Sequence, residues 1–176
     1  MIMRSSHIVD VSFFQRPVLE VAPELLGKNL VRKLPDGSIH RSIITETEAY
    51  DGPLDLACHG SKGRTKRNEV MFCEGGVWYV YFIYGMYWML NAVTGEINDP
   101  SAVLIRGTLD SRGPGRLTRH FQIDRSLNGM LIDPSSELWI EEGETVSSKK
   151  IRRTPRIGLD YAGPWAKKPY RFVLDS

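Results

Sequence analysis

The sequence is poor in the residues that build metal sites and disulfide frameworks. Its 176 residues include only two cysteines, Cys58 and Cys73, and neither stands in the closely spaced Cys or His pairs typical of zinc sites. Two cysteines also fall short of a disulfide framework, which favours a reducing compartment. We therefore expect no metal site, and we expect both thiols to be small buried apolar groups.

Long apolar segments are also missing. The longest apolar run, residues 77–93, is interrupted by tyrosine and tryptophan rings, a glycine and an asparagine, so it predicts strands instead of a membrane span. No secretory signal is visible, because Arg4 and the polar residues after it lead into no apolar region. We expect no membrane partner, and a location in the cytoplasm, at the nucleoid, of a bacterium or in the nucleus of a eukaryote.

The net charge of +2 is too small to indicate nucleic-acid binding by itself, but the basic residues are unevenly placed. They form three groups: Lys62, Arg64, Lys66 and Arg67; Arg112, Arg116 and Arg119; and Lys149, Lys150, Arg152, Arg153, Arg156, Lys167, Lys168 and Arg171. Each group alone is typical of a solvated surface. Together they flank an aromatic segment, which favours a polyanionic partner.

Short strand patterns separated by turn residues dominate the chain. Residues 30–32 and 39–47 flank a Pro-Asp-Gly turn and predict a hairpin. Further strands are expected at residues 77–84, 86–93, 102–107, 138–141 and 170–173, and the basic stretch between the last two is expected to be mostly loop. Helical patterns are few and short, without regular βαβ alternation. We expect one α+β domain over residues 1–176, with a curved, mostly antiparallel and partly barrel-like sheet, a protruding hairpin, and a loose arm at residues 1–12.

Two carboxylates close the first predicted hairpin. Glu46 and Glu48 are two residues apart, so on a continuous strand both point to the same face, and Tyr50 shares it if the strand continues. The pair is either one functional acid with a solvated or capping neighbour, or two coupled acids. A charged solvent face of an edge strand is the simpler explanation.

Aromatic residues crowd the strands that follow. Tyr79, Tyr81, Tyr84 and Tyr87 place four hydroxyls within nine residues, and each needs a partner if buried. Most strand rings belong to a core, but a pocket for a flat ring would use both ring face and hydroxyl. The Tyr-Gly-Met sequence at residues 84–86 predicts a tight bend that points bulky side chains outward.

Three other features admit two readings each. His59 lies in a predicted loop and is either a hydrogen-bonded loop histidine or a catalytic one. Asn91 could contact a purine edge or bond to backbone. Residues 112–116, Arg-Gly-Pro-Gly-Arg, precede a helical pattern, so they could bind phosphate through free N–H groups or form an ordinary capped helix.

Several short motifs, taken in order, cover nearly the whole chain and are specific as a set. They are Glu46-Thr47-Glu48-Ala49-Tyr50, Arg67-Asn68, Met71-Phe72, Tyr79-Val80-Tyr81, Ile83-Tyr84-Gly85-Met86-Tyr87, Asn91, Val103-Leu104-Ile105-Arg106, Gly113-Pro114, Ala162-Gly163, Trp165 and Lys168-Pro169. With these motifs the sequence resembles the 3-methyladenine DNA glycosylases of the alkyladenine type. These are monomeric purine-excising repair enzymes, unrelated to the helix-hairpin-helix glycosylases.

The resemblance implies a role for each matched residue. Glu48 would be the general base that activates water, with Arg106 beside it, and Glu46 would have no catalytic part. Tyr50 and Tyr81 would stack on an extruded purine. The two remaining pocket residues are His59, which would hydrogen-bond to the purine edge, and Asn91, which would reject the exocyclic amine of guanine.

The resemblance also implies how the duplex is held. Tyr84, at the tip of the hairpin, would wedge into the duplex with Met86 and Tyr87 beside it. Contacts to the DNA backbone are expected from Arg64, Arg67, Arg112, Gly113, Arg116, Lys167 and Lys168.

The expected function is therefore that of a monofunctional DNA glycosylase. It would flip alkylated or deaminated purines out of double-stranded DNA and hydrolyse the N-glycosidic bond to leave an abasic site, as a monomer and without a cofactor. No lysine is placed as an amine nucleophile, so no strand cleavage is expected. The alternatives are a damaged-DNA-binding module without catalysis and a hydrolase of small nucleosides.

Overall fold

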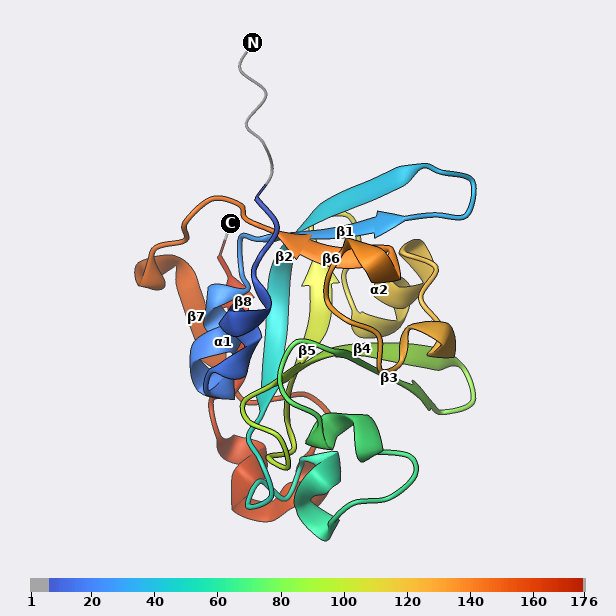
Figure 1. Ribbon diagram of the computed structural model, residues 1–176. Helices are drawn as coiled ribbons and strands as arrows, with labels where there is room; N and C mark the ends of the chain where they lie inside the picture. The colour runs from blue at the N-terminus through green and yellow to red at the C-terminus, as the bar shows by residue number, and fades with distance from the viewer. Residues whose placement is uncertain (1–6, 176) are drawn as a thin grey trace.

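The structure is a computed structural model that describes residues 7–175, and its centre is one eight-stranded antiparallel sheet (Figure 1). The strands are β1 (Asn29–Lys33), β2 (Ile39–Tyr50), β3 (Trp78–Ile83), β4 (Tyr87–Thr94), β5 (Ser101–Thr108), β6 (Leu138–Glu141), β7 (Ile151–Thr154) and β8 (Arg171–Leu174). The helices are α1 (Val18–Glu24) and α2 (Pro114–His120), with short 3₁₀ turns η1 (Val11–Gln15), η2 (His59–Lys62), η3 (Glu69–Phe72), η4 (Arg125–Leu127), η5 (Pro134–Ser136), η6 (Ser148–Lys150) and η7 (Asp160–Lys167). The expected α+β fold with an antiparallel sheet is confirmed.

The sheet is curved but open. Its hydrogen-bonding order is β3-β4-β5-β2-β1-β6, and β8 joins β2 and carries β7 at its outer side. Strands β3 and β6 stand at the two ends of this order, so the sheet does not close into a barrel. A main core of apolar side chains, including Phe14, Ile44, Trp78 and Phe172, is fully buried and packs the sheet against α1 and α2.

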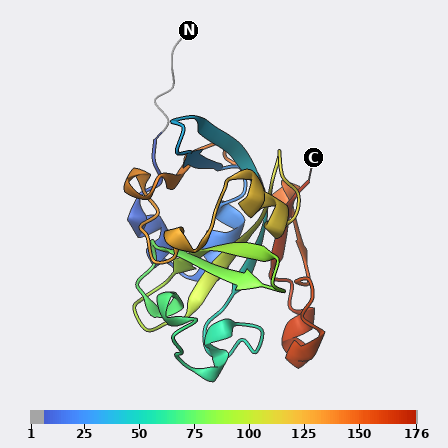
Figure 2. The same cartoon turned by 90° about the vertical axis from the view of Figure 1, so that its right-hand side faces the viewer.

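Strand β2 is the longest element and positions the site. Its first half pairs with β1, and its second half lies between β5 and β8. Register shifts against β5 on both sides of Glu46 let the strand change neighbours along its length. The far end of β2 meets η2, η3 and η7, which gather at one end of the molecule in both views (Figures 1 and 2).

Two parts of the sequence behave differently from expectation. Residues 151–154 were expected in a loop but form β7, because their backbone pairs with β8. Only Ile151 among them is apolar, so their side chains give no strand pattern. In the expected arm, residues 1–6 lie outside the described residues, whereas Val9 is buried and bonds to Ile140 O at 2.9 Å. Within the described part of the arm, Val9 is thus anchored to β6, whereas the residues on either side of it, Ile8 and Asp10, are exposed. None of the helices within residues 7–175 combines the length and hydropathy that a membrane crossing requires.

Candidate active site

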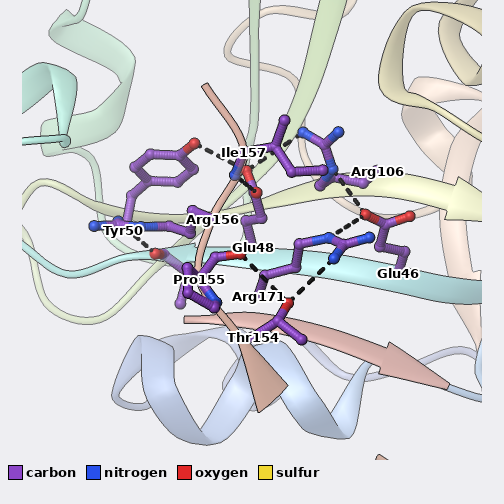
Figure 3. Close-up of polar contacts among 10 residues, drawn as sticks. Glu46, Glu48, Tyr50, Arg106, Thr154, Pro155, Arg156, Ile157 and Arg171 are labelled. Atoms are coloured by element: carbon purple, nitrogen blue, oxygen red, sulfur yellow. Dashed lines mark hydrogen bonds and ion pairs between the residues drawn. The ribbon is translucent and has the colours of Figure 1, made fainter. Parts of the chain in front are cut away.

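Glu48 lies inside the sheet and is 0% exposed. In the pairing it stands between Leu104 of β5 and Arg171 of β8. Its Oε1 accepts hydrogen bonds from the Tyr50 hydroxyl at 3.0 Å and from Arg106 Nη1 at 3.4 Å, and its Oε2 accepts one from the Ile157 N–H at 2.8 Å (Figure 3). Both oxygens are thus oriented by fixed donors.

The neighbouring Glu46 belongs to the same network but has different partners. Arg106 Nε donates to Glu46 Oε1 at 2.9 Å, so one guanidinium bridges the two carboxylates of β2. Arg171 Nε donates to the same oxygen at 2.6 Å. Glu46 and Glu48 therefore share a face, as their spacing predicts, and Glu46 holds two arginines in place (Figure 3).

Burial makes Glu48 a stronger base than an ordinary glutamate. Loss of solvation raises its pKa, and Arg106, the Ile157 N–H and the Tyr50 hydroxyl oppose that rise only in part. Burial, followed by the charge of Glu48, raises the pKa of Tyr50 well above its ordinary value, so this phenol stays protonated and donates. The arrangement is an oriented, basic carboxylate that is surrounded by fixed polar donors.

A ring-lined pocket lies beside this carboxylate. It is lined by Tyr50, His59, Met71, Tyr79, Tyr81 and Asn91, and the space between these side chains is narrow, with a cavity volume of about 10 Å³. The ring of His59 meets the ring of Tyr81 with centroids 4.6 Å apart and an angle of 63°. All four residues expected to contact a base therefore come together in one pocket.

Tyr79 and Met71 complete the pocket, although no pocket role was expected for either. The Tyr79 hydroxyl lies 3.1 Å from His59 Nδ1, and Asn91 Nδ2 donates to Tyr79 O at 3.2 Å. Burial, followed by the nearby Arg67 charge, lowers the pKa of His59 and favours its neutral form. Tyr79 was visible in the sequence as one of four clustered tyrosines, but nothing in the pattern separated it from the others.

A buried ion pair behind the site was not anticipated either. Arg156, counted in the sequence among the surface cations, donates to the two carboxylate oxygens of Asp55 at 2.5 and 2.9 Å, and both side chains are 0% exposed. Its Nη1 also donates to Ala49 O at 2.9 Å. This pair fixes the loop that carries Ile157. Spacing gives no signal for it, because its members are 101 residues apart.

The β3–β4 hairpin projects a bulky tip. Met86 N–H donates to Ile83 O at 3.1 Å, and the two residues between them, Tyr84 and Gly85, have φ angles of 55° and 62°. Two successive positive φ angles are those of a type I′ turn. Tyr84 and Met86 are exposed, whereas Tyr87 is half-buried.

Tyr87 packs against helix α2. A Cβ added at Gly115 would lie 2.5 Å from the Tyr87 ring, and the guanidinium of Arg119 lies 5.9 Å from the ring centroid. Of the three residues expected to enter DNA, Tyr87 is thus the one that also holds the hairpin to the body of the protein.

The expected DNA-backbone contacts are on the surface, in contrast to Arg106, Arg156 and Arg171. Exposed side chains are those of Arg64, Arg67, Arg112, Arg116, Lys167 and Lys168, and Gly113 has a φ of 97° with open space around it. Arg67 donates to Phe82 O at 3.1 Å, beside the hairpin tip. The basic groups of the sequence therefore divide into an internal set and a solvent-facing set.

Comparison with known proteins gives a consistent result. The sequence model of the family described as methylpurine-DNA glycosylase (MPG) matches residues 12–111 and 110–176. A protein of Methanocella arvoryzae is 48% identical over 94% of this chain and 91% of its own length. Proteins of Psychrobacter cryohalolentis and Myxococcus xanthus are 43% and 45% identical over 96% and 94% of this chain, and 92% and 89% of their own lengths. Each of the three bears the name "Putative 3-methyladenine DNA glycosylase".

Proposed function

The chain belongs to the methylpurine-DNA glycosylase family and is thus a DNA glycosylase, a hydrolase that binds DNA; from this premise we propose that it is monofunctional. It flips an alkylated or deaminated purine out of double-stranded DNA and hydrolyses the N-glycosidic bond, leaving an intact abasic site. The name shared by its relatives points to 3-methyladenine as one such base.

The observation that carries the proposal is the setting of Glu48. Its carboxylate is buried, raised in pKa and held by three donors beside a ring-lined pocket. Departure of a purine leaves positive character on the deoxyribose, which a nearby carboxylate stabilises while it takes a proton from water. The water oxygen bonds to the sugar carbon as the carbon–nitrogen bond breaks, and the bond electrons leave with the base. A purine alkylated at N3 or N7 is already cationic and leaves without prior protonation, whereas a neutral base such as hypoxanthine takes a proton from solvent as it leaves.

The pocket supplies recognition in this proposal. Tyr50 and Tyr81 stack on the extruded base, and His59 bonds to its edge. Support comes from the lowered pKa of His59 and its contact with Tyr79, which together favour a neutral imidazole of fixed orientation. Asn91, whose amide is tied to Tyr79 O, excludes the exocyclic amine of normal guanine.

The hairpin tip and the surface cations hold the duplex. Tyr84 fills the space that the flipped base vacates, and Met86 and Tyr87 contact the adjacent bases. Unstacking one base costs a few kcal/mol, which wedge contacts offset. Backbone phosphates are bound by the exposed set, Arg64, Arg67, Arg112, Gly113, Arg116, Lys167 and Lys168. The active unit is a monomer and needs no cofactor.

The test uses Glu48→Gln, with Glu46→Gln as the matched control on the same strand. With protein in excess over a duplex that contains one hypoxanthine, we expect Glu48→Gln to lose excision by at least about a hundredfold, with DNA affinity retained. Glu46→Gln should keep most of the activity, because Arg106 still bonds to Glu48. Excision at the wild-type rate by Glu48→Gln would refute the assignment.

The product and the salt dependence separate this proposal from its alternatives. A module without catalysis would bind lesion-bearing duplex but release no base. A hydrolase of small nucleosides would cleave inosine and show little salt dependence, whereas several phosphate contacts give a steep fall of log affinity with log salt. An intact abasic strand, cleaved only on heating in alkali, is the expected product.

A further inference from the structure

The buried Asp55–Arg156 pair lies directly behind the proposed base pocket. The guanidinium carbon of Arg156 is 4.8 Å from the centroid of the Tyr50 ring, over its face. Because that face is covered, the Tyr50 ring can offer only its other face to the pocket that it lines. A base stacked on Tyr50 therefore has a guanidinium on the far side of the same ring.

Arg156 keeps its charge at this position. Burial opposes ionisation, but the hydrogen bonds and the charge of Asp55 outweigh it and raise the pKa of the guanidinium. Both oxygens of Asp55 bond to Arg156, and neither side chain is reached by solvent. The two charges cancel only as long as both are present.

A cationic base and a neutral base respond differently to such a pair. A positive charge 4.8 Å behind a ring repels a cation stacked in front of it and has little effect on a neutral ring. We propose that Asp55 determines the preference of the pocket for cationic purines, because it neutralises Arg156 behind the ring of Tyr50. The inference rests on the proposed function and adds to it a residue that discriminates between classes of damaged base.

A purely structural role would give a different result. A buried ion pair broken at one partner destabilises the fold by several kcal/mol, and this loss affects every substrate alike. The proposed charge effect instead changes the ratio of the excision rate constants of two substrates, and both constants are measured with one protein preparation. With the guanidinium 4.8 Å behind the ring and a base about 3.5 Å in front, the charges are about 8 Å apart. At an effective dielectric constant of about 20, an uncompensated charge at that distance changes the ratio by roughly tenfold or more.

The experiment compares single-turnover excision of 7-methylguanine, which is cationic, and of hypoxanthine, which is neutral, from otherwise identical duplexes. Asp55→Asn should lower the ratio of the two rate constants by about tenfold. Arg156→Gln, which leaves Asp55 uncompensated, should raise that ratio, and the double variant should return it to the wild-type value. Each of the three proteins is an independent test, so one that fails to fold leaves the other two.

Glu141→Gln is the matched control, because Glu141 is a buried carboxylate that is paired with Arg41 on the opposite part of the sheet. It should leave the ratio unchanged even if it lowers stability. An equal fall for both lesions in Asp55→Asn, or a double variant that retains the altered ratio, would overturn the inference.

A second readout does not depend on excision. The nucleosides 7-methylguanosine and inosine, titrated against the same proteins and followed by intrinsic fluorescence, should show the same change in relative affinity. If the wild type excises neither lesion, the proposed function fails, and this titration still decides the inference: an unchanged affinity ratio, or no binding of either nucleoside, overturns it.

Discussion

The backbone at the hairpin tip makes Tyr84 a good site for a decisive perturbation. Its φ of 55° lies in the left-handed region, where asparagine or glycine is the usual choice in a two-residue turn. Its side chain is 81% exposed, so it contributes little packing to the fold. A strained backbone that carries an exposed ring is understandable if the ring acts on a partner.

The expected magnitudes follow from these two facts. Tyr84→Ala should change the free energy of unfolding by less than about 0.5 kcal/mol, because an exposed side chain is removed. Tyr84→Gly removes backbone strain of about 1 kcal/mol, but glycine loses more conformational entropy on folding, which costs a comparable or smaller free energy. The glycine variant should therefore be as stable as the alanine variant or slightly more stable. Loss of one stacked ring costs about 1–3 kcal/mol in the DNA complex, which is about fivefold to 150-fold in the flipping equilibrium.

The assay follows base flipping and hydrolysis separately. Stopped-flow fluorescence of 2-aminopurine placed next to the lesion reports unstacking, and quenched single-turnover samples report base release. Tyr84→Ala and Tyr84→Gly should both lower the flipped fraction, with a smaller effect on hydrolysis once the base is extruded. Tyr84→Phe, which keeps the ring, is the matched control and should behave as the wild type does.

Two outcomes would refute the wedge role of Tyr84. If the alanine and glycine variants flip the base as completely as the wild type, the tip does not act as a wedge. If Tyr84→Ala flips the base less completely and Tyr84→Gly flips it as the wild type does, the backbone conformation at this position matters and the ring does not. Thermal unfolding of the three variants shows whether any loss reflects the fold instead.

Four further predictions concern Glu48, the pocket and the hairpin. The rate of hypoxanthine excision should fall as the pH is lowered, because only the ionised form of Glu48 takes a proton from water. Burial raises the pKa of Glu48, so the midpoint of this fall should lie above the ordinary glutamate pKa. A single-turnover pH profile that stays flat to pH 4.5 would contradict this. Because the pKa of Glu48 is raised in the folded protein, protonated Glu48 stabilises the fold. This contribution to the free energy of unfolding is complete below the unfolded-state pKa and is lost as the pH rises through the folded-state pKa. The melting temperature of Glu48→Gln should therefore rise relative to that of the wild type over that interval. Tyr79→Phe removes the hydroxyl that lies 3.1 Å from His59 Nδ1, so base affinity should fall about fivefold to tenfold, measured by titration with an ethenoadenine duplex, while the melting temperature changes little. Gly115→Ala places a Cβ 2.5 Å from the Tyr87 ring and should lower the free energy of unfolding by about 1–3 kcal/mol, whereas an unchanged urea midpoint would show that the ring moves freely.

Much of the sheet could be predicted because its signals are local. The Pro-Asp-Gly turn and the alternation around it predict the β1–β2 hairpin, and the Tyr-Gly-Met bend predicts the β3–β4 tip. Strand β7 could not be predicted, because residues 151–154 carry mostly polar side chains and become a strand only through backbone bonds to β8. Local patterns report what a segment prefers, and not which distant edge it will meet.

Within residues 7–12, the burial of Val9 escaped prediction for the same reason. Nothing in their composition marks them as part of a core. Val9 is buried because β6, far along the chain, offers the carbonyl of Ile140 and a covering surface.

The sequence by itself determined the side chains of the site and their local placement. The two-residue spacing on one strand puts Glu46 and Glu48 on one face, and the crowding of tyrosines supplies the rings of the pocket. Only the tertiary structure decided which carboxylate is buried among fixed donors and which one binds two arginines. It also decided that Arg156, one cation in a basic run, turns inward to Asp55. The reason is physical: burial and pairing depend on segments about a hundred residues apart that meet only in the folded protein.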